Sequence, residues 1–335
     1  MIKQPTAYQD LQDPQARPRY AGIASFFRAP PSQDLTDTDI GLIGVPFDGG
    51  VTNRSGARHG PRAVREQSTL LRRINAATRV QPFAAARVRD LGDCWIERPY
   101  DLITALSEIE AFYRIVTAAG IVPLSVGGDH SISLPILRAV AAMHGPVGMI
   151  HIDAHSDTGD DYLGSRFHHG APFRRAAEEN LIDPQRVIQI GIRGTTNDPD
   201  MWGFSQRSGM RVVSMDEFAD LGWRAVAEEA RRIAGTGKVY LTYDIDSLDP
   251  SQAPGTGTPE AGGIGVHEAL RLLRSLQGLD LVGGDLVEVA PSFDVGTLTA
   301  FNGASILFEI LCLLAEAFQQ RTRDQRSPEA GGERA

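Results

Sequence analysis

Hydrophobic and polar positions form two kinds of block along the chain. Short apolar runs have the length of buried strands, and the stretches between them repeat apolar residues every three or four positions, as amphipathic helices do. The predicted strands span residues 40–45, 88–91, 121–126, 147–152, 187–191, 211–214, 238–243 and 280–287. The clearest helical patterns span 101–119 and 216–234. This alternation predicts an α/β fold of three layers, with a central, mainly parallel eight-stranded sheet between helices.

The domain organisation follows from the absence of any linker-like stretch or repeat of fixed period in the 335 residues. We expect a single domain over residues 39–319, a peripheral N-terminal segment over 1–38, and a disordered polar tail over 320–335. The N-terminus lacks an apolar signal region, and the apolar stretch 304–318 contains two glutamates and is too short to span a bilayer. We therefore expect a cytoplasmic protein that does not bind membranes.

Composition narrows the possible partners. Hydrophobic residues make up 42% of the chain, which suits a soluble protein with a sizeable core, and the formal net charge is -9. This charge argues against a nucleic-acid partner and favours a small cationic ligand. The two cysteines, Cys94 and Cys312, belong to no CxxC motif, so we expect buried, reduced thiols and no disulfide framework.

Three polar segments follow directly after predicted strands. They are GGDHS at 127–131, DAHSD at 153–157 and DIDSLDP at 244–250. The carboxyl ends of parallel strands meet at one edge of a sheet, and alternate residues of an extended segment face the same way. We therefore expect six side chains to converge there: His130, Asp153, His155, Asp157, Asp244 and Asp246.

The chemistry of these six side chains predicts a metal site. Four carboxylates in a confined space repel one another strongly, and a single ion rarely needs six protein ligands with four negative charges, so two divalent ions are expected. Carboxylate and imidazole ligands without thiolate suit manganese first, with nickel, iron, cobalt or zinc as alternatives. Solvent between two such ions becomes a nucleophile near neutral pH. Asp129 and Asp249 are expected to orient the ligands.

The three segments, in this order and at these separations, resemble the ureohydrolase family, which includes arginases and agmatinases and hydrolyses guanidino compounds to urea and an amine. The resemblance covers residues 41 to 314. Its agmatinase-like branch is favoured by four further stretches: GVTNRSGARHGPRAVR at 50–65, QIGIRG at 189–194, APGTGTPEAGG at 253–263 and DLVEVAPSFD at 285–294. The resemblance implies an arginase-like fold and a homo-oligomer, either a trimer or a hexamer.

The resemblance also implies roles for single residues. One metal would be held by His130, Asp153, Asp157 and Asp244, and the other by Asp153, His155, Asp244 and Asp246. His169, which precedes Gly170, matches the histidine that carries a proton to the leaving amine, and the neighbouring His168 is its competitor. Glu288 matches the carboxylate that binds the guanidinium through charge-assisted hydrogen bonds.

The substrate depends on the loop 158–170. Asp160 and Asp161 would attract the terminal amine of agmatine, whereas Arg166 would attract the carboxylate of guanidinobutanoate or guanidinopropanoate; either charge could instead be solvated. The leading expectation is an agmatinase that releases putrescine and urea. The chain differs from common agmatinases at four places: Ala171, Phe293, Asp285 and the stretch IGVHE at 264–268. These differences leave room for a guanidino acid, free guanidine or a biguanide such as metformin as the substrate.

Two other classes of function compete with a ureohydrolase. An inactive structural partner in a mixed oligomer is disfavoured because all six metal-ligand side chains and Glu288 are present. A deacetylase-like or phosphoesterase-like two-metal enzyme is disfavoured by Glu288 and by the lack of a basic phosphate clamp near the motifs.

Overall fold

One eight-stranded sheet organises the residues that the computed structural model describes, 18–196 and 199–326. The strands are β1 (Ile40–Val45), β2 (Val88–Asp93), β3 (Val122–Gly127), β4 (Val147–Ile152), β5 (Ile182–Ile192), β6 (Arg211–Ser214), β7 (Val239–Asp244) and β8 (Leu281–Val287). They lie in the order β2-β1-β3-β8-β7-β4-β5-β6, and all neighbours pair in parallel. The predicted sheet is therefore confirmed, and it is parallel throughout.

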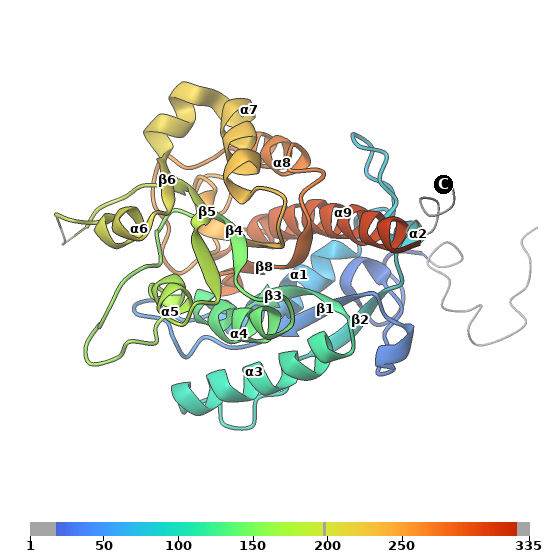
Figure 1. The fold of residues 1–335 in the computed structure, drawn as a ribbon. Helices are drawn as coiled ribbons and strands as arrows, with labels where there is room; N and C mark the ends of the chain where they lie inside the picture. The colour runs from blue at the N-terminus through green and yellow to red at the C-terminus, as the bar shows by residue number, and fades with distance from the viewer. Residues whose placement is uncertain (1–17, 197–198, 327–335) are drawn as a thin grey trace, which may run out of the picture.

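Helices cover both faces of this sheet (Figure 1). One layer contains α1 (Gly60–Ser68), α7 (Met215–Ala234), α8 (Val266–Arg274) and α9 (Leu298–Arg326), and the other contains α3 (Leu102–Ala118), α4 (Ser133–His144) and α5 (Pro172–Glu178). The short helices α2 (Pro82–Ala85) and α6 (Gly203–Ser208) lie near the ends of the sheet. A separate hydrophobic core fills the space between the sheet and each layer. The predicted three-layer architecture is confirmed.

Strand β5 begins at Ile182, whereas the sequence pattern predicts a start at residue 187. The additional residues, 183–186, are polar and include a proline, so they lack the apolar pattern of a buried strand. They join β5 through a register irregularity against β4, between Val147 and Met149. Pairing with a neighbouring strand therefore extends β5 where its own side chains give no signal.

Helix α9 corrects the prediction for the C-terminal tail. It continues to Arg326, so residues 320–326 are helical, while 327–335 lie outside the described residues. Arg321 fixes this end of the helix, because its Nη1 lies 2.7 Å from Asp280 Oδ1 and donates to the Leu281 carbonyl oxygen at 2.8 Å. By length and composition α9 could cross a membrane, but 78% of its apolar window is buried inside the protein, as in the core helix of a soluble fold.

The N-terminal segment is also less peripheral than predicted. Residues 1–17 lie outside the described part, but Phe26 and Phe27 are 0% and 2% exposed and belong to the core beside α9. The Phe26 amide donates to Asp90 Oδ2 at 2.8 Å. Two adjacent aromatic residues show no strand or helix periodicity, which is why the pattern alone left them outside the core.

Four adjacent strands in the middle of the sheet, β3, β8, β7 and β4, place the polar motifs together. His130 follows β3, Glu288 follows β8, Asp244 ends β7, and Asp153 follows β4. The turn after β3 requires glycine at position 128, because a Cβ there would lie 2.0 Å from the Phe47 carbonyl oxygen. The motifs thus meet at the carboxyl edge of the sheet, where ligand sites of α/β folds lie.

Candidate metal centre and substrate pocket

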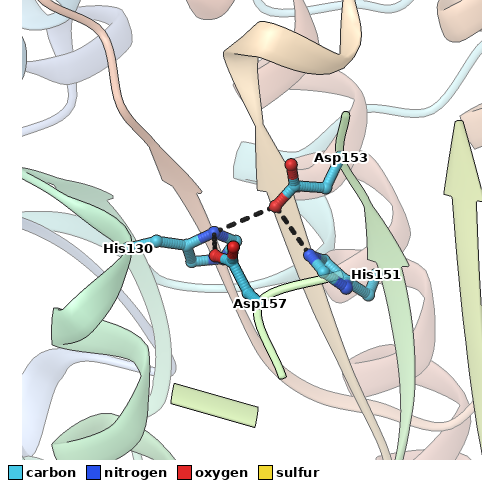
Figure 2. A group of neighbouring side chains, drawn as sticks. All are labelled: His130, His151, Asp153 and Asp157. Atoms are coloured by element: carbon cyan, nitrogen blue, oxygen red, sulfur yellow. Dashed lines mark hydrogen bonds and ion pairs between the residues drawn. The ribbon is translucent and has the colours of Figure 1, made fainter. Parts of the chain in front are cut away.

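The first cluster of ligand-type side chains surrounds His130. Its Nδ1 atom lies 3.1 Å from Asp153 Oδ2, 2.9 Å from Asp157 Oδ2 and 3.3 Å from Asp244 Oδ2. Figure 2 shows the side chains of His130, Asp153 and Asp157 pointing toward one another. All four residues of this cluster are buried, and Asp157 adopts a positive φ of 50°, an uncommon conformation for aspartate that brings its carboxylate to the cluster.

The second cluster lies beside the first and shares Asp153 with it. His155 Nδ1 lies 3.5 Å from Asp153 Oδ1 and 3.2 Å from Asp246 Oδ2. Asp153 therefore offers one carboxylate oxygen to each cluster. The structure brings all six predicted metal ligands together, from three segments that are more than twenty residues apart in the sequence.

The geometry of the clusters fits divalent cations. The buried His130 Nδ1 has three carboxylate oxygens within 3.3 Å but forms a well-directed hydrogen bond with none of them. Oxygen and nitrogen atoms that converge without hydrogen-bonding one another are arranged as ligands around a common centre. Their chemistry, carboxylate with imidazole and without thiolate, suits Mn²⁺ and related metals.

The charges of the clusters also favour bound divalent cations. Burial alone would lower the pKa of His130 and of His155, but the carboxylates around them outweigh it and raise the pKa of both rings well above the usual value. Burial, together with Asp246 and Asp153, raises the pKa of Asp244 well above its usual value. So many buried acids favour either added protons or bound cations, and two divalent cations would balance four carboxylates.

Glu288 and His169 form a pair next to the first cluster. Glu288 has a positive φ of 64°, and its Oε1 accepts the His130 amide at 2.8 Å and lies 2.9 Å from His169 Nδ1. Its Oε2 is buried and has no hydrogen-bond partner among the described residues. This second oxygen is therefore suited to accept from a cationic ligand.

The protonation of His169 is subject to two opposing influences. Burial lowers the pKa of the ring, but the Glu288 carboxylate outweighs it and raises the pKa to about 9. The Thr52 amide, by contrast, donates to Nε2 at 3.2 Å, which only an unprotonated Nε2 accepts, while the Thr52 hydroxyl lies 2.7 Å from the same atom. The ring can thus exchange a proton through Nε2, with Glu288 fixing Nδ1.

A cavity of about 600 Å³ opens beside the clusters. Its inner end is lined by His155, Asp157, Asp244 and His169. Its outer wall comes from the loop 158–170 and from residues 192–207, and includes Tyr162, Arg174, Asp200, Met201, Trp202, Phe204 and Arg207. An elongated small molecule could therefore place one end at the clusters and the other against this wall.

The loop residues predicted to bind substrate are already engaged. Asp160 lies on the wall but is 2.9 Å from Arg174 Nη2 and 2.9 Å from Arg175 Nη2. Asp161 also lies on the wall, and its Oδ1 accepts the Gly164 amide at 2.9 Å. Arg166 is not among the residues that line this cavity, and its Nη2 lies 2.9 Å from Glu178. The structure therefore does not bring Arg166 to the pocket.

Several residues with a place in the site were not singled out by the sequence pattern. Thr242 Oγ1 lies 2.8 Å from His130 Nε2 and holds that ring in place. Arg174, on α5, resembles an ordinary solvated helix charge in sequence, yet it lines the cavity and stacks on Phe204, with 4.7 Å between the guanidinium carbon and the ring centroid. Such contacts depend on the packing of distant elements, so no local signal marks them.

The expected supporting residues are found beside the clusters. Asp129 Oδ2 accepts the Gly50 amide at 2.7 Å, and Asp249 Oδ2 accepts the Gly262 and Gly263 amides at 3.0 and 3.1 Å. Both carboxylates therefore fix loops that carry or flank ligand-type residues. Cys94 and Cys312 are free and buried, as predicted.

A parallel sheet whose central strands end in two adjoining His/Asp clusters defines a class of metal-dependent α/β hydrolases. The profile of the arginase family matches residues 38–313, and the chain belongs to this family. It is accordingly a ureohydrolase, an enzyme that hydrolyses linear amidines.

Its relatives act on different guanidino compounds. The chain is 54% identical over 301 residues to the guanidinopropionase of Pseudomonas aeruginosa, and the alignment covers 90% of this chain and 94% of that protein. It is 46% identical to the mitochondrial agmatinase of Gallus gallus, over 89% of this chain and 87% of that protein. Among solved structures, the proclavaminate amidino hydrolase of Streptomyces clavuligerus superposes with a TM-score of 0.87 at 41% identity, covering 90% of this chain and all of the other.

Proposed function

We propose that this ureohydrolase acts on a guanidino acid, with guanidinopropanoate or guanidinobutanoate as substrate, and releases urea and an ω-amino acid. The observation that carries this choice lies on the outer cavity wall, where Asp160 is already paired with arginines and Arg174 keeps its Nη1 without a partner among the described residues. The 54% identity to a guanidinopropionase supports the same choice. The chain would thus differ from the agmatinase that the sequence motifs first favoured.

The inner end of the cavity is suited to a guanidinium. The unpartnered Oε2 of Glu288 would accept from it, while Oε1 remains bound to His130 and His169. We propose that His169 then delivers a proton to the leaving amine from Nε2, relayed by the Thr52 hydroxyl at 2.7 Å. Two divalent cations, when bound by the six His and Asp side chains, supply an acidified solvent nucleophile. Manganese is the proposed metal, with nickel as the alternative.

The outer end of the cavity is suited to a carboxylate. Arg174 uses Nη2 for Asp160 and Nε for Glu178, which leaves its Nη1 without a partner among the described residues. The two loop acids on the wall differ, because Asp160 is held by Arg174 and Arg175, whereas Asp161 is exposed and accepts one backbone amide. A terminal amine that bound at Asp160 would have to displace an existing ion pair, which costs binding free energy.

Arg174 provides the test of this proposal. With manganese-loaded protein, Arg174→Met should raise KM for guanidinopropanoate and guanidinobutanoate about tenfold to a hundredfold, the effect of losing one charged hydrogen bond. Arg114→Met is the matched control, since Arg114 also pairs with a glutamate but lies on α3 and is exposed. Unchanged KM in Arg174→Met would remove Arg174 from substrate binding, and urea release from agmatine alone would return the assignment to an agmatinase.

A further inference from the structure

A chain of three hydrogen bonds runs beside the two His/Asp clusters and ends on Asp153. Gln189 Nε2 donates to the Ser156 carbonyl oxygen at 2.6 Å and lies 3.0 Å from His151 Nδ1. His151 Nε2 in turn lies 2.8 Å from Asp153 Oδ2, and Figure 2 shows this ring pointing at the same Asp153 oxygen that His130 approaches. Gln189 and His151 are fully buried and are directly paired across strands β5 and β4.

The chemistry of the groups fixes the position of every proton in this chain. The Ser156 carbonyl can only accept, so the Gln189 atom facing it is the amide nitrogen and not the oxygen. An amide nitrogen does not accept, so its second hydrogen is donated to His151 Nδ1. With Nδ1 accepting, the ring proton of neutral His151 resides on Nε2 and is donated to Asp153 Oδ2.

The surroundings hold this arrangement in place. The His151 ring packs against both Phe173 and His130, with centroid distances of 4.5 Å and 5.4 Å, and these two rings also contact each other at 5.0 Å. Gln189 Oε1 is buried without a hydrogen-bond partner. Turning the amide over would place this oxygen against the Ser156 carbonyl, so the amide keeps one orientation although it leaves an acceptor unused.

We propose that Gln189 is a positioning residue that acts through the tautomer of His151 to orient Asp153, the carboxylate shared by both clusters. The hydrogen bond from His151 Nε2 holds the plane of the Asp153 carboxylate, so that Oδ2 faces the His130 cluster while Oδ1 faces His155. Because both ring nitrogens of His151 are engaged, His151 supports the metal centre without being a ligand. This inference rests on the metal-dependent activity proposed above, and it assigns a role to two residues outside the six ligands.

Manganese affinity tests the proposal by a readout separate from turnover. Dissociation constants for Mn²⁺, measured by competition with a chelator, should be weakened tenfold to a hundredfold in Gln189→Leu and in His151→Phe. The matched control is Gln185→Leu, because Gln185 lies on the same strand but is exposed, and its side-chain amide donates to the Ser208 carbonyl oxygen, away from the clusters. Affinity in Gln189→Leu within twofold of the parent protein would overturn the proposal.

The tautomer itself is measured by ¹⁵N NMR of the histidine rings in the metal-free protein. The signals of His151, identified by their loss in His151→Phe, should show the proton on Nε2 in the parent protein. In Gln189→Glu they should show a proton on Nδ1, since a carboxylate accepts where the amide donates. A proton on Nδ1 in the parent protein would overturn the proposal even if the leucine variant fails to fold. A parent protein with the Nε2 proton but no manganese binding would instead contradict the proposed function.

Discussion

At the scale of single residues, Glu288 shows how backbone and side chain combine at the site. Its positive φ turns the side chain back from the end of β8, so that one oxygen binds His130 and His169 and the other has no partner among the described residues. Such a conformation is uncommon for glutamate and is found where surrounding contacts stabilise it. The positive φ therefore holds the Glu288 carboxylate against His169, which lines the inner end of the cavity.

Replacing Glu288 with glutamine should separate substrate binding from metal binding. The change keeps the size of the side chain but removes its charge, so kcat/KM for urea release should fall about tenfold to a hundredfold. Manganese affinity should stay within about threefold, because Glu288 is not among the converging ligand-type side chains. Steady-state kinetics and metal titration measure the two effects, and full activity of Glu288→Gln would rule out the guanidinium-binding role.

The His169–Glu288 pair should make stability depend on pH. Burial lowers the pKa of His169, but the Glu288 carboxylate outweighs it and raises the folded-state pKa to about 9. The pair therefore contributes its full stabilisation at pH values below the unfolded-state pKa of about 6.5. This stabilisation, on the order of 3 kcal/mol, is lost as pH rises through about 9. The melting temperature of the metal-free parent protein should therefore approach that of His169→Gln between pH 7 and pH 10. A constant difference over this range would show that the Thr52 amide keeps the ring neutral.

At the scale of elements, the strands that carry the ligands were predictable, and their order in the sheet was not. The runs before GGDHS, DAHSD and DIDSLDP are mostly apolar because they are buried on both faces, so their ends could be located to within a residue. The adjacency of β3, β8, β7 and β4 depends on pairing between segments far apart in sequence. Local patterns carry no information on such pairing.

The turn after β3 provides a test at this scale. Gly128→Ala should destabilise the fold by about 3 kcal/mol, because the new Cβ would meet the backbone oxygens of Phe47 and Val45, which cannot move independently of β1. Gly265→Ala is the control, since its Cβ would meet only the flexible side-chain ends of Glu268 and Gln252. Chemical denaturation of both variants measures the difference, and equal stability would show that the turn can relax.

At the scale of the whole molecule, the reaction class and the convergence of six ligand-type side chains could be predicted from the sequence, but the substrate could not. The three motifs resemble those of ureohydrolases, and the arginase-family match confirms this class. The charges of loop 158–170 do not by themselves indicate the substrate, because Asp160 is paired by arginines on α5 and Arg166 lies outside the cavity wall. Only the packing of α5 against this loop shows which charges remain available.

The most direct measurement of the central claim is the ratio of kcat/KM for guanidinopropanoate to that for agmatine, from urea release by one manganese-loaded preparation. The pairing of Asp160 and the unpartnered Nη1 of Arg174 predict at least a tenfold preference for the guanidino acid, because an amine that binds at Asp160 must displace an ion pair. A ratio that favours agmatine would contradict the guanidino-acid assignment. Absence of urea from every guanidino compound would contradict the hydrolytic mechanism itself.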